Sequence, residues 1–233
     1  MVDLIFAKTA RQFTDRLKFT TRRSATPARV AQWIKAWETR PDFDHGALDR
    51  FRLNGGLKIG TFKLTAQPYI ERLGEMPEEH LALEGGTCKT LPEFFARYFP
   101  GESLLDNVLV IPFAPTPAKL KPGVIARLPT TIGTIATDTV VVLNISTIED
   151  WKRNWPNPEK RSNFEPMATC FPLVGRSGDR RYVEQLCSFP PNRLIPMVEQ
   201  YTADGFDPHQ AIATYEEKRE SEGHRQHPQL SLF

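Results

Sequence analysis

The apolar and polar positions of the first half of the chain predict short strands alternating with amphipathic helices. A strand is expected over residues 3–7 and a helix over residues 9–17. A second helix begins at Pro27 and ends before Pro41, because apolar residues recur between these prolines at intervals of three and four. These residues are Val30, Trp33, Ile34 and Trp37.

Turn signals bound the next elements. The turn Asn54-Gly55-Gly56 leads into a strand over residues 57–66. Thr90 is expected to cap a helix over residues 91–98, and residues 108–111 form a continuous apolar strand.

The pattern changes after Phe113. Residues 114–122 are rich in Pro, Lys and Ala, which predicts a linker or a long crossing loop. Strands are expected over residues 139–145 and around 169–174, with Trp151 and Trp155 on a helix or loop between them. Asp207 and Pro208 open a C-terminal helix. We therefore expect a domain over residues 1–114, an extension of mixed structure over 115–206, and a helical stalk and tail over 207–233.

Composition and charge limit the class of protein. The 233 residues are 40% hydrophobic and 25% charged, with a net charge of +2, so any contact with nucleic acid requires a local basic patch. Cys88, Cys170 and Cys187 are odd in number and form no CxxC pair, which favours reduced thiols. Since the chain has neither a signal-peptide pattern nor a membrane-length apolar run, we expect a cytoplasmic protein with no membrane partner.

The basic segment from Lys18 to Arg23 is the first candidate for chemistry. Lys18 and Thr21 are three residues apart, so a tight bend would place amine and hydroxyl on the same side. A lysine whose pKa is lowered by burial or by Arg22 and Arg23 can accept the hydroxyl proton and make threonine a nucleophile. The alternative is a solvated basic loop without a catalytic role.

Glu84, which precedes Gly85 and Gly86, is the second candidate. In a semi-apolar pocket its carboxyl group would have a raised pKa and could donate a proton. The alternative is a helix C-terminus, at which Gly85 ends the helix and Glu84 is its last exposed residue.

The order of these motifs resembles the ASCH domain family over residues 1–114. The K-x-x-T-x-R motif from Lys18 to Arg23 is followed by a G-x-x-I-G strand that ends at Gly60 and by a segment that ends in Glu84-Gly85-Gly86. The resemblance implies an α+β protein whose N-terminal domain is a small PUA-like β-barrel with flanking helices. The C-terminal extension and the polar helical tail follow it.

The resemblance also implies a site and an activity. Some ASCH proteins are amidohydrolases that remove the acetyl group of acetylcytidine, and others are RNA-binding proteins. By this likeness Lys18 accepts a proton, Thr21 attacks the amide carbonyl and Glu84 protonates the leaving amine. Basic residues near this segment would contact substrate or nucleic acid. They are Arg16, Arg22, Arg23 and Lys35.

Other motifs are weaker. His224 and His227 lack an evident third metal ligand, so we expect no metal and no cofactor. Trp33 and Trp37 could stack on bases, but their helical spacing is more typical of a core.

The last five residues resemble the motif with which bacterial replication and repair proteins bind the sliding clamp, the beta subunit of the replicative polymerase. They are Gln229, Leu230, Ser231, Leu232 and Phe233. The polar run over residues 216–226 suits a solvated stalk, whereas the alternative is a tail that packs on its own domain. The motif implies a nucleoid-associated protein of bacterial, phage or plasmid origin that acts in DNA replication.

Together these features predict a protein that recognises a modified nucleobase, hydrolyses its N-acyl amide bond and docks on the clamp. The alternatives are an adaptor that binds RNA or DNA without catalysis, and a clamp-directed modulator of replication in which the barrel is only a scaffold.

Overall fold

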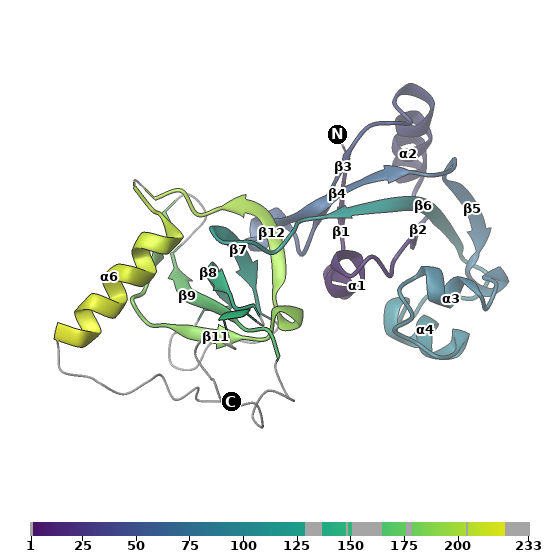
Figure 1. Ribbon diagram of the computed structural model, residues 1–233. Helices are drawn as coiled ribbons and strands as arrows, with labels where there is room; N and C mark the ends of the chain where they lie inside the picture. Colours follow the sequence, from purple (N-terminus) through teal and green to yellow (C-terminus); the bar gives the residue numbers. More distant parts are fainter. Residues whose placement is uncertain are drawn as a thin grey trace. The chain divides into compact units, whose positions relative to one another are not determined.

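The computed structural model describes residues 2–128, 137–147, 149–150, 165–175, 179–203 and 205–221. The chain divides into two compact units, residues 1–118 and 119–233 (Figure 1). Among the described residues a curled half-barrel sheet is accompanied by few helices, so the predicted α+β class is confirmed.

The first unit is organised around one long strand, β6 (Asn107–Pro117). The sheet order is β1 (Asp3–Ile5), β3 (His45–Leu48), β4 (Lys58–Leu64), β6 and β2 (Thr20–Ser24), with β5 (Tyr69–Arg72) also paired to β6. Strand β2 lies along one edge of β6, whereas β5 and β4 follow one another along the other edge. Three strands therefore depend on β6 for their hydrogen bonds.

The linker expected over residues 114–122 was wrong in its first part, because residues 114–117 belong to β6. The prolines that suggested a linker are tolerated there for a physical reason. The backbone nitrogens of Pro115 and Pro117 face the edge of β6 along which β2 runs. Because the β2 pairing ends at Pro112, no strand there requires an N–H from these two prolines. Pro112 itself falls between the end of the β5 pairing and the start of the β4 pairing, where no ladder bond is lost.

Aromatic rings fill the core beneath this sheet. The Phe6 ring lies 4.8 Å from that of Phe13 and 5.6 Å from that of Phe113, measured between centroids. Helix α1 (Ala10–Thr14) supplies Phe13, and helix α2 (Pro27–Thr39) supplies Trp33, which is 1% exposed. Trp33 packs against His45 of β3, so it belongs to the core.

A smaller cluster holds two further helices. Helix α3 (His80–Leu83) and helix α4 (Leu91–Tyr98) pack around buried apolar side chains. The first unit also contains two short 3-10 turns, η1 (Arg52–Asn54) and η2 (Leu73–Glu75). The Thr90 side chain accepts a hydrogen bond from the Glu93 N–H at 3.4 Å, as expected of a helix cap. The cluster consists of Leu73, Met76, Leu81, Cys88, Phe94, Phe99 and Val108.

The second unit contains a sheet of its own, which the sequence pattern predicted only in part. Its described strands are all antiparallel, in the order β10 (Arg181–Tyr182), β9 (Ala168–Val174), β8 (Thr139–Ile145), β7 (Val124–Arg127) and β12 (Ile195–Gln200). Strand β11 (Cys187–Phe189) pairs with β9. The turn η4 (Pro191–Arg193) and helix α6 (Pro208–Ser221) complete this unit.

Strands β8 and β9 match the two strands predicted there, and α6 begins at the expected proline. Trp151, Trp155, the His224–His227 pair and the five-residue tail lie outside the described residues. In the part of the chain that the structure describes, no helix is long and apolar enough to span a membrane.

Burial of His45 among aromatic rings gives stability a predictable pH dependence. Burial lowers the pKa of His45 below its ordinary value, so the unfolded chain takes up a proton that the folded protein does not bind. Stability should therefore fall as pH drops below about 6.5, by at most about 1.4 kcal/mol per pH unit from this residue. Urea unfolding between pH 7.5 and 5 measures the loss.

His45→Phe should reduce this acid-dependent loss, because the substituted ring cannot be protonated. His209, exposed on α6, is the matched control, and His209→Gln should behave like the unsubstituted protein. An equal acid-dependent loss in His45→Phe would show that another group causes it.

Candidate functional site

Lys18 and Glu84 are brought together by an isolated antiparallel bridge. Lys18 immediately precedes the Phe19–Thr20 entry into β2, and Glu84 immediately follows α3. The Phe19 N–H donates to the Leu83 carbonyl at 2.7 Å, which fixes the two segments side by side. Two residues separated by most of the first unit in sequence are therefore held face to face by the backbone.

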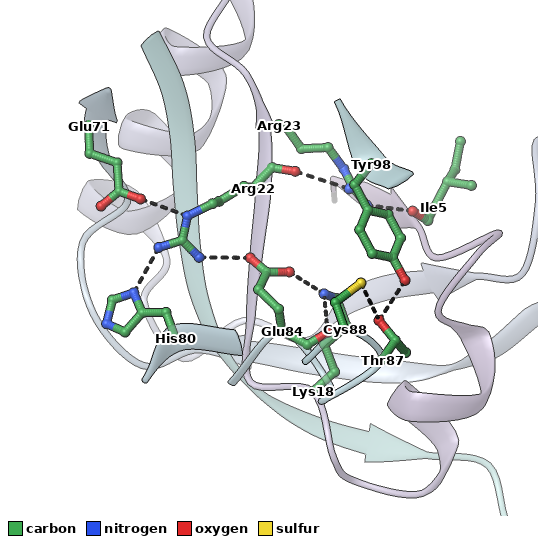
Figure 2. A network of polar contacts seen from close by, with 10 residues as sticks. All are labelled: Ile5, Lys18, Arg22, Arg23, Glu71, His80, Glu84, Thr87, Cys88 and Tyr98. Carbon is green, nitrogen blue, oxygen red and sulfur yellow. Dashed lines mark hydrogen bonds and ion pairs between the residues drawn. The ribbon is translucent and has the colours of Figure 1, made fainter. Parts of the chain in front are cut away.

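The Glu84 carboxylate is buried and both of its oxygens accept hydrogen bonds (Figure 2). The Lys18 ammonium donates to Oε2 and also to the Glu84 backbone carbonyl, at 2.9 Å in the latter case. Arg22 Nη1 donates to Oε1 at 3.0 Å. Lys18 and Arg22 are four residues apart in an extended segment, so their side chains point to the same side.

Arg22 extends this network to two more elements. Its Nε donates to Glu71 of β5 at 2.6 Å, and its Nη2 lies 2.7 Å from His80 Nδ1 at the start of α3. Since a guanidinium has no acceptor, Nδ1 of His80 must accept this bond. The ring therefore carries its hydrogen on Nε2.

Gly85, which follows Glu84, adopts a backbone conformation and a close approach that suit only glycine. Gly85 has a φ of +104°, and a Cβ on it would lie 2.8 Å from Cβ of Gln12. Its N–H donates to the Ala82 carbonyl, so the predicted helix end at Gly85 is confirmed. Glu84, however, is only 4% exposed, so the alternative in which it is merely the last, exposed residue of a helix does not hold.

Burial also changes the acidity of Lys18. Loss of hydration lowers its pKa, and the nearby charges of Arg23 and Arg22 lower it further, whereas the Glu84 carboxylate opposes the shift. Lys18 therefore gives up its proton more readily than an exposed lysine does. A solvated basic loop, the other interpretation of this segment, does not describe Lys18 or Arg22, which are each 2% exposed.

A cavity of about 310 Å³ opens beside this network within the first unit. Its volume is at the lower end of the range typical of small-molecule sites. Lys18, Arg22 and Glu84 form part of its wall, and Phe94, Tyr98 and Phe99 supply apolar surface. The remaining lining residues are Ile5, Phe6, Ala7, Lys8, Thr9, Arg23, Ser24, Arg29 and Glu102.

The other residues predicted for the site occupy different positions. Thr21 is fully buried, its hydroxyl has no hydrogen-bond partner, and it does not line the cavity. Arg23 lines the cavity, whereas Arg16 and Lys35 are exposed and do not. The structure thus brings together Lys18, Glu84 and the two arginines, but leaves Thr21 out of hydrogen-bonding contact with Lys18.

Some site residues were missed from sequence. Glu71 and His80 hold Arg22, and Lys8 lines the cavity. The spacing of four between His80 and Glu84 was a usable signal, since it fits one helical turn. No local pattern connects Glu71 with Arg22, because they lie on β5 and β2, which pair with opposite edges of β6.

The described residues contain no cluster of three or more His, Cys, Asp or Glu side chains suited to a metal ion. Comparisons of the chain with protein families, curated proteins and solved structures found no match.

The network predicts an order of stability among variants. Glu84→Ala leaves both Lys18 and Arg22 without this carboxylate in a buried setting, so it should cost about 3 to 5 kcal/mol. Lys18→Met should cost less, because Glu84 retains Arg22. The measurement is the free energy of urea unfolding at pH 7.

Glu75→Ala is the matched control, since its carboxylate is exposed and lies 3.9 Å from Arg72. That change should stay within about 0.5 kcal/mol of the unsubstituted protein. If Glu84→Ala were no more costly than Glu75→Ala, the network would not stabilise the fold.

Proposed function

We propose that residues 1–118 form a PUA-like unit of the ASCH type, which recognises a modified nucleobase in the cavity beside Lys18 and Glu84. The observation that carries this proposal is the buried Lys18–Glu84–Arg22 network in the wall of a cavity of about 310 Å³. A planar base fits such a volume, and the rings of Phe94, Tyr98 and Phe99 offer it apolar surface. Fixed donors and one carboxylate supply hydrogen bonds to its edge.

Hydrolysis of an N-acyl amide on cytosine is the chemistry that best uses these groups. Lys18 would first pass its proton to Glu84, which it contacts directly, and the lowered pKa of Lys18 favours this transfer. The neutral amine would then accept the Thr21 hydroxyl proton as Thr21 attacks the carbonyl carbon, and Glu84 would donate its proton to the departing amine. Water would then cleave the threonine ester and release the acid.

A non-catalytic adaptor is the second candidate, and the position of Thr21 favours it. The Thr21 hydroxyl is buried, lies outside the cavity wall and has no hydrogen bond to Lys18. In this arrangement the nucleophile is not assembled with its base. A unit that only binds a base requires the cavity and the Lys18–Glu84–Arg22 network but not this hydroxyl.

Thr21→Val separates the two candidates. Replacing an unpartnered buried hydroxyl by a methyl group of similar shape should leave the free energy of unfolding unchanged or raise it by about 1 kcal/mol. If Thr21 is the nucleophile, this stable variant should bind acetylcytidine but release no cytidine. Calorimetry measures binding, and chromatography measures the cytidine formed.

Each outcome decides between the candidates. Cytidine release that survives in Thr21→Val would contradict the role of Thr21. Binding of acetylcytidine without turnover by the unsubstituted protein would favour the adaptor. If neither acetylcytidine nor cytidine binds, nucleobase recognition itself is wrong. Phe51→Ala, at a side chain that is 63% exposed and does not line the cavity, should leave binding unchanged.

We also propose that the Gln229–Phe233 pentapeptide docks this unit on a bacterial sliding clamp, which places it among proteins of DNA replication. The support is in the sequence, where Leu232 and Phe233 supply apolar anchors and Gln229 supplies an amide. Binding to the clamp would favour a base within a nucleic acid over a freely diffusing nucleoside as the ligand. It would also keep the protein in the cytoplasm near the nucleoid.

Deleting residues 229–233 should abolish co-elution with a bacterial clamp and leave the unfolding temperature unchanged. Loss of Leu232 and Phe233 removes the apolar contacts, so the double change to alanine should behave like the deletion. Ser231→Ala is the control and should retain binding. A truncated chain that still co-elutes with the clamp would contradict this role of the tail.

A further inference from the structure

Three cationic side chains of the cavity, Lys8, Arg23 and Arg29, share one feature. They line it together, and each donates hydrogen bonds to backbone carbonyls instead of carboxylates. Lys8 Nζ donates to the Arg97 carbonyl at 2.9 Å, and Arg29 Nη1 donates to the Ser24 carbonyl at 2.6 Å. Arg23 donates to the carbonyls of Ile5, at 2.6 Å, and Arg22, at 3.1 Å.

The carboxylates near them are engaged elsewhere. Glu84 is held by Lys18 and Arg22, and Glu102 accepts a hydrogen bond from the Ser24 hydroxyl at 3.0 Å. Among the described residues no carboxylate lies within 4.0 Å of the charged nitrogens of Lys8, Arg23 or Arg29. Five cationic and only two acidic side chains line the cavity, so the net charge of its lining is positive.

Arg23 makes this side of the cavity favourable for an anion. Arg23 is half-buried, and loss of hydration lowers its pKa; the neighbouring charge of Arg29 lowers it further, whereas the Glu84 carboxylate opposes the shift. An anion placed between the two groups would relieve their repulsion and replace lost hydration. A guanidinium group can donate two parallel hydrogen bonds to two oxygens of one phosphate, and a lysine ammonium adds a positive point charge.

We propose that Lys8, Arg23 and Arg29 form a phosphate subsite, so that the ligand of the cavity is a nucleotide and not a free nucleoside. The base half of this inference rests on the proposed function, whereas the phosphate half rests only on the three cations. The phosphate belongs either to a free nucleotide or to the backbone of a nucleic acid strand. Both present the same oxygens to the subsite.

The test compares four probes on the full-length protein by calorimetry: cytidine, cytidine 5′-monophosphate, ribose 5-phosphate and a single-stranded cytidine trinucleotide. Cytidine 5′-monophosphate should bind at least about tenfold more tightly than cytidine, and raising salt should weaken only the phosphorylated probes. Arg23→Gln and Arg29→Gln should bring the monophosphate to within about twofold of cytidine. The loss of one charge-assisted hydrogen bond changes an affinity by more than a factor of two, so this reduction is within reach of a single substitution.

Two controls keep the result interpretable. Lys63→Gln removes an exposed charge on β4, outside the cavity, so it should leave all four affinities unchanged. Arg23 also supports the Ile5 carbonyl, so thermal unfolding must accompany each variant. If Arg23→Gln is unstable, Arg29→Gln and Lys8→Gln carry the test, because the hydrogen bonds of these two side chains are exposed, whereas those of Arg23 are partly buried.

The outcomes separate this inference from the proposed function. Equal affinity for cytidine and its monophosphate would overturn the phosphate subsite. Ribose 5-phosphate that binds as tightly as the monophosphate, and loses affinity in Arg29→Gln, would support the subsite while contradicting nucleobase recognition. A trinucleotide that binds more tightly than the monophosphate identifies a nucleic acid strand as the source, and the reverse order identifies a free nucleotide.

Discussion

The burial of the Glu84 carboxylate is the constraint on which the candidate site depends. A carboxylate that is 4% exposed is unfavourable unless cations and hydrogen bonds replace its water. Lys18 and Arg22 provide this replacement, and Glu71 balances the second cation. Because these residues come from the segment before β2, from β2 itself, from β5 and from the end of α3, the network fixes four parts of the first unit relative to one another.

The strand β6 explains how these parts meet. Its two edges hold β2 on one side and β5 on the other, so Arg22 and Glu71 are brought within reach by the same ladder. The glycine that ends α3 then turns the chain closely past Gln12 and places Glu84 against Lys18. Backbone geometry thus assembles the charges, and the charges in turn stabilise that geometry.

The cavity has two sides of different electrostatic character. Around Glu84 positive and negative groups are matched and buried, which suits the fixed recognition of a polar base edge. Around Arg23 the cations lack carboxylate partners and face the cavity, which suits a charged group brought by a ligand. The unpartnered hydroxyl of Thr21 belongs to neither side, because Thr21 is buried outside the cavity wall.

The sequence by itself determined the elements whose signals are local. Pro27 and Thr90 marked the starts of α2 and α4, Gly85 marked the end of α3, and alternating or continuous apolar runs marked β4 and β8. It also selected Lys18 and Glu84, through a motif order that resembles a known family. These predictions needed only the few residues around each position.

Tertiary structure alone decided what depends on pairing between distant segments. The prolines of β6 indicated a linker, yet they fit a strand because its neighbours leave their positions unbonded. The strands β10 and β11, of two and three residues, are too short for a recognisable period and exist only through their partners. Likewise, nothing local joined Arg22 to Glu71 or separated Thr21 from the cavity. The physical reason is that hydrogen bonds and charges act through space, whereas the sequence pattern records only neighbours along the chain.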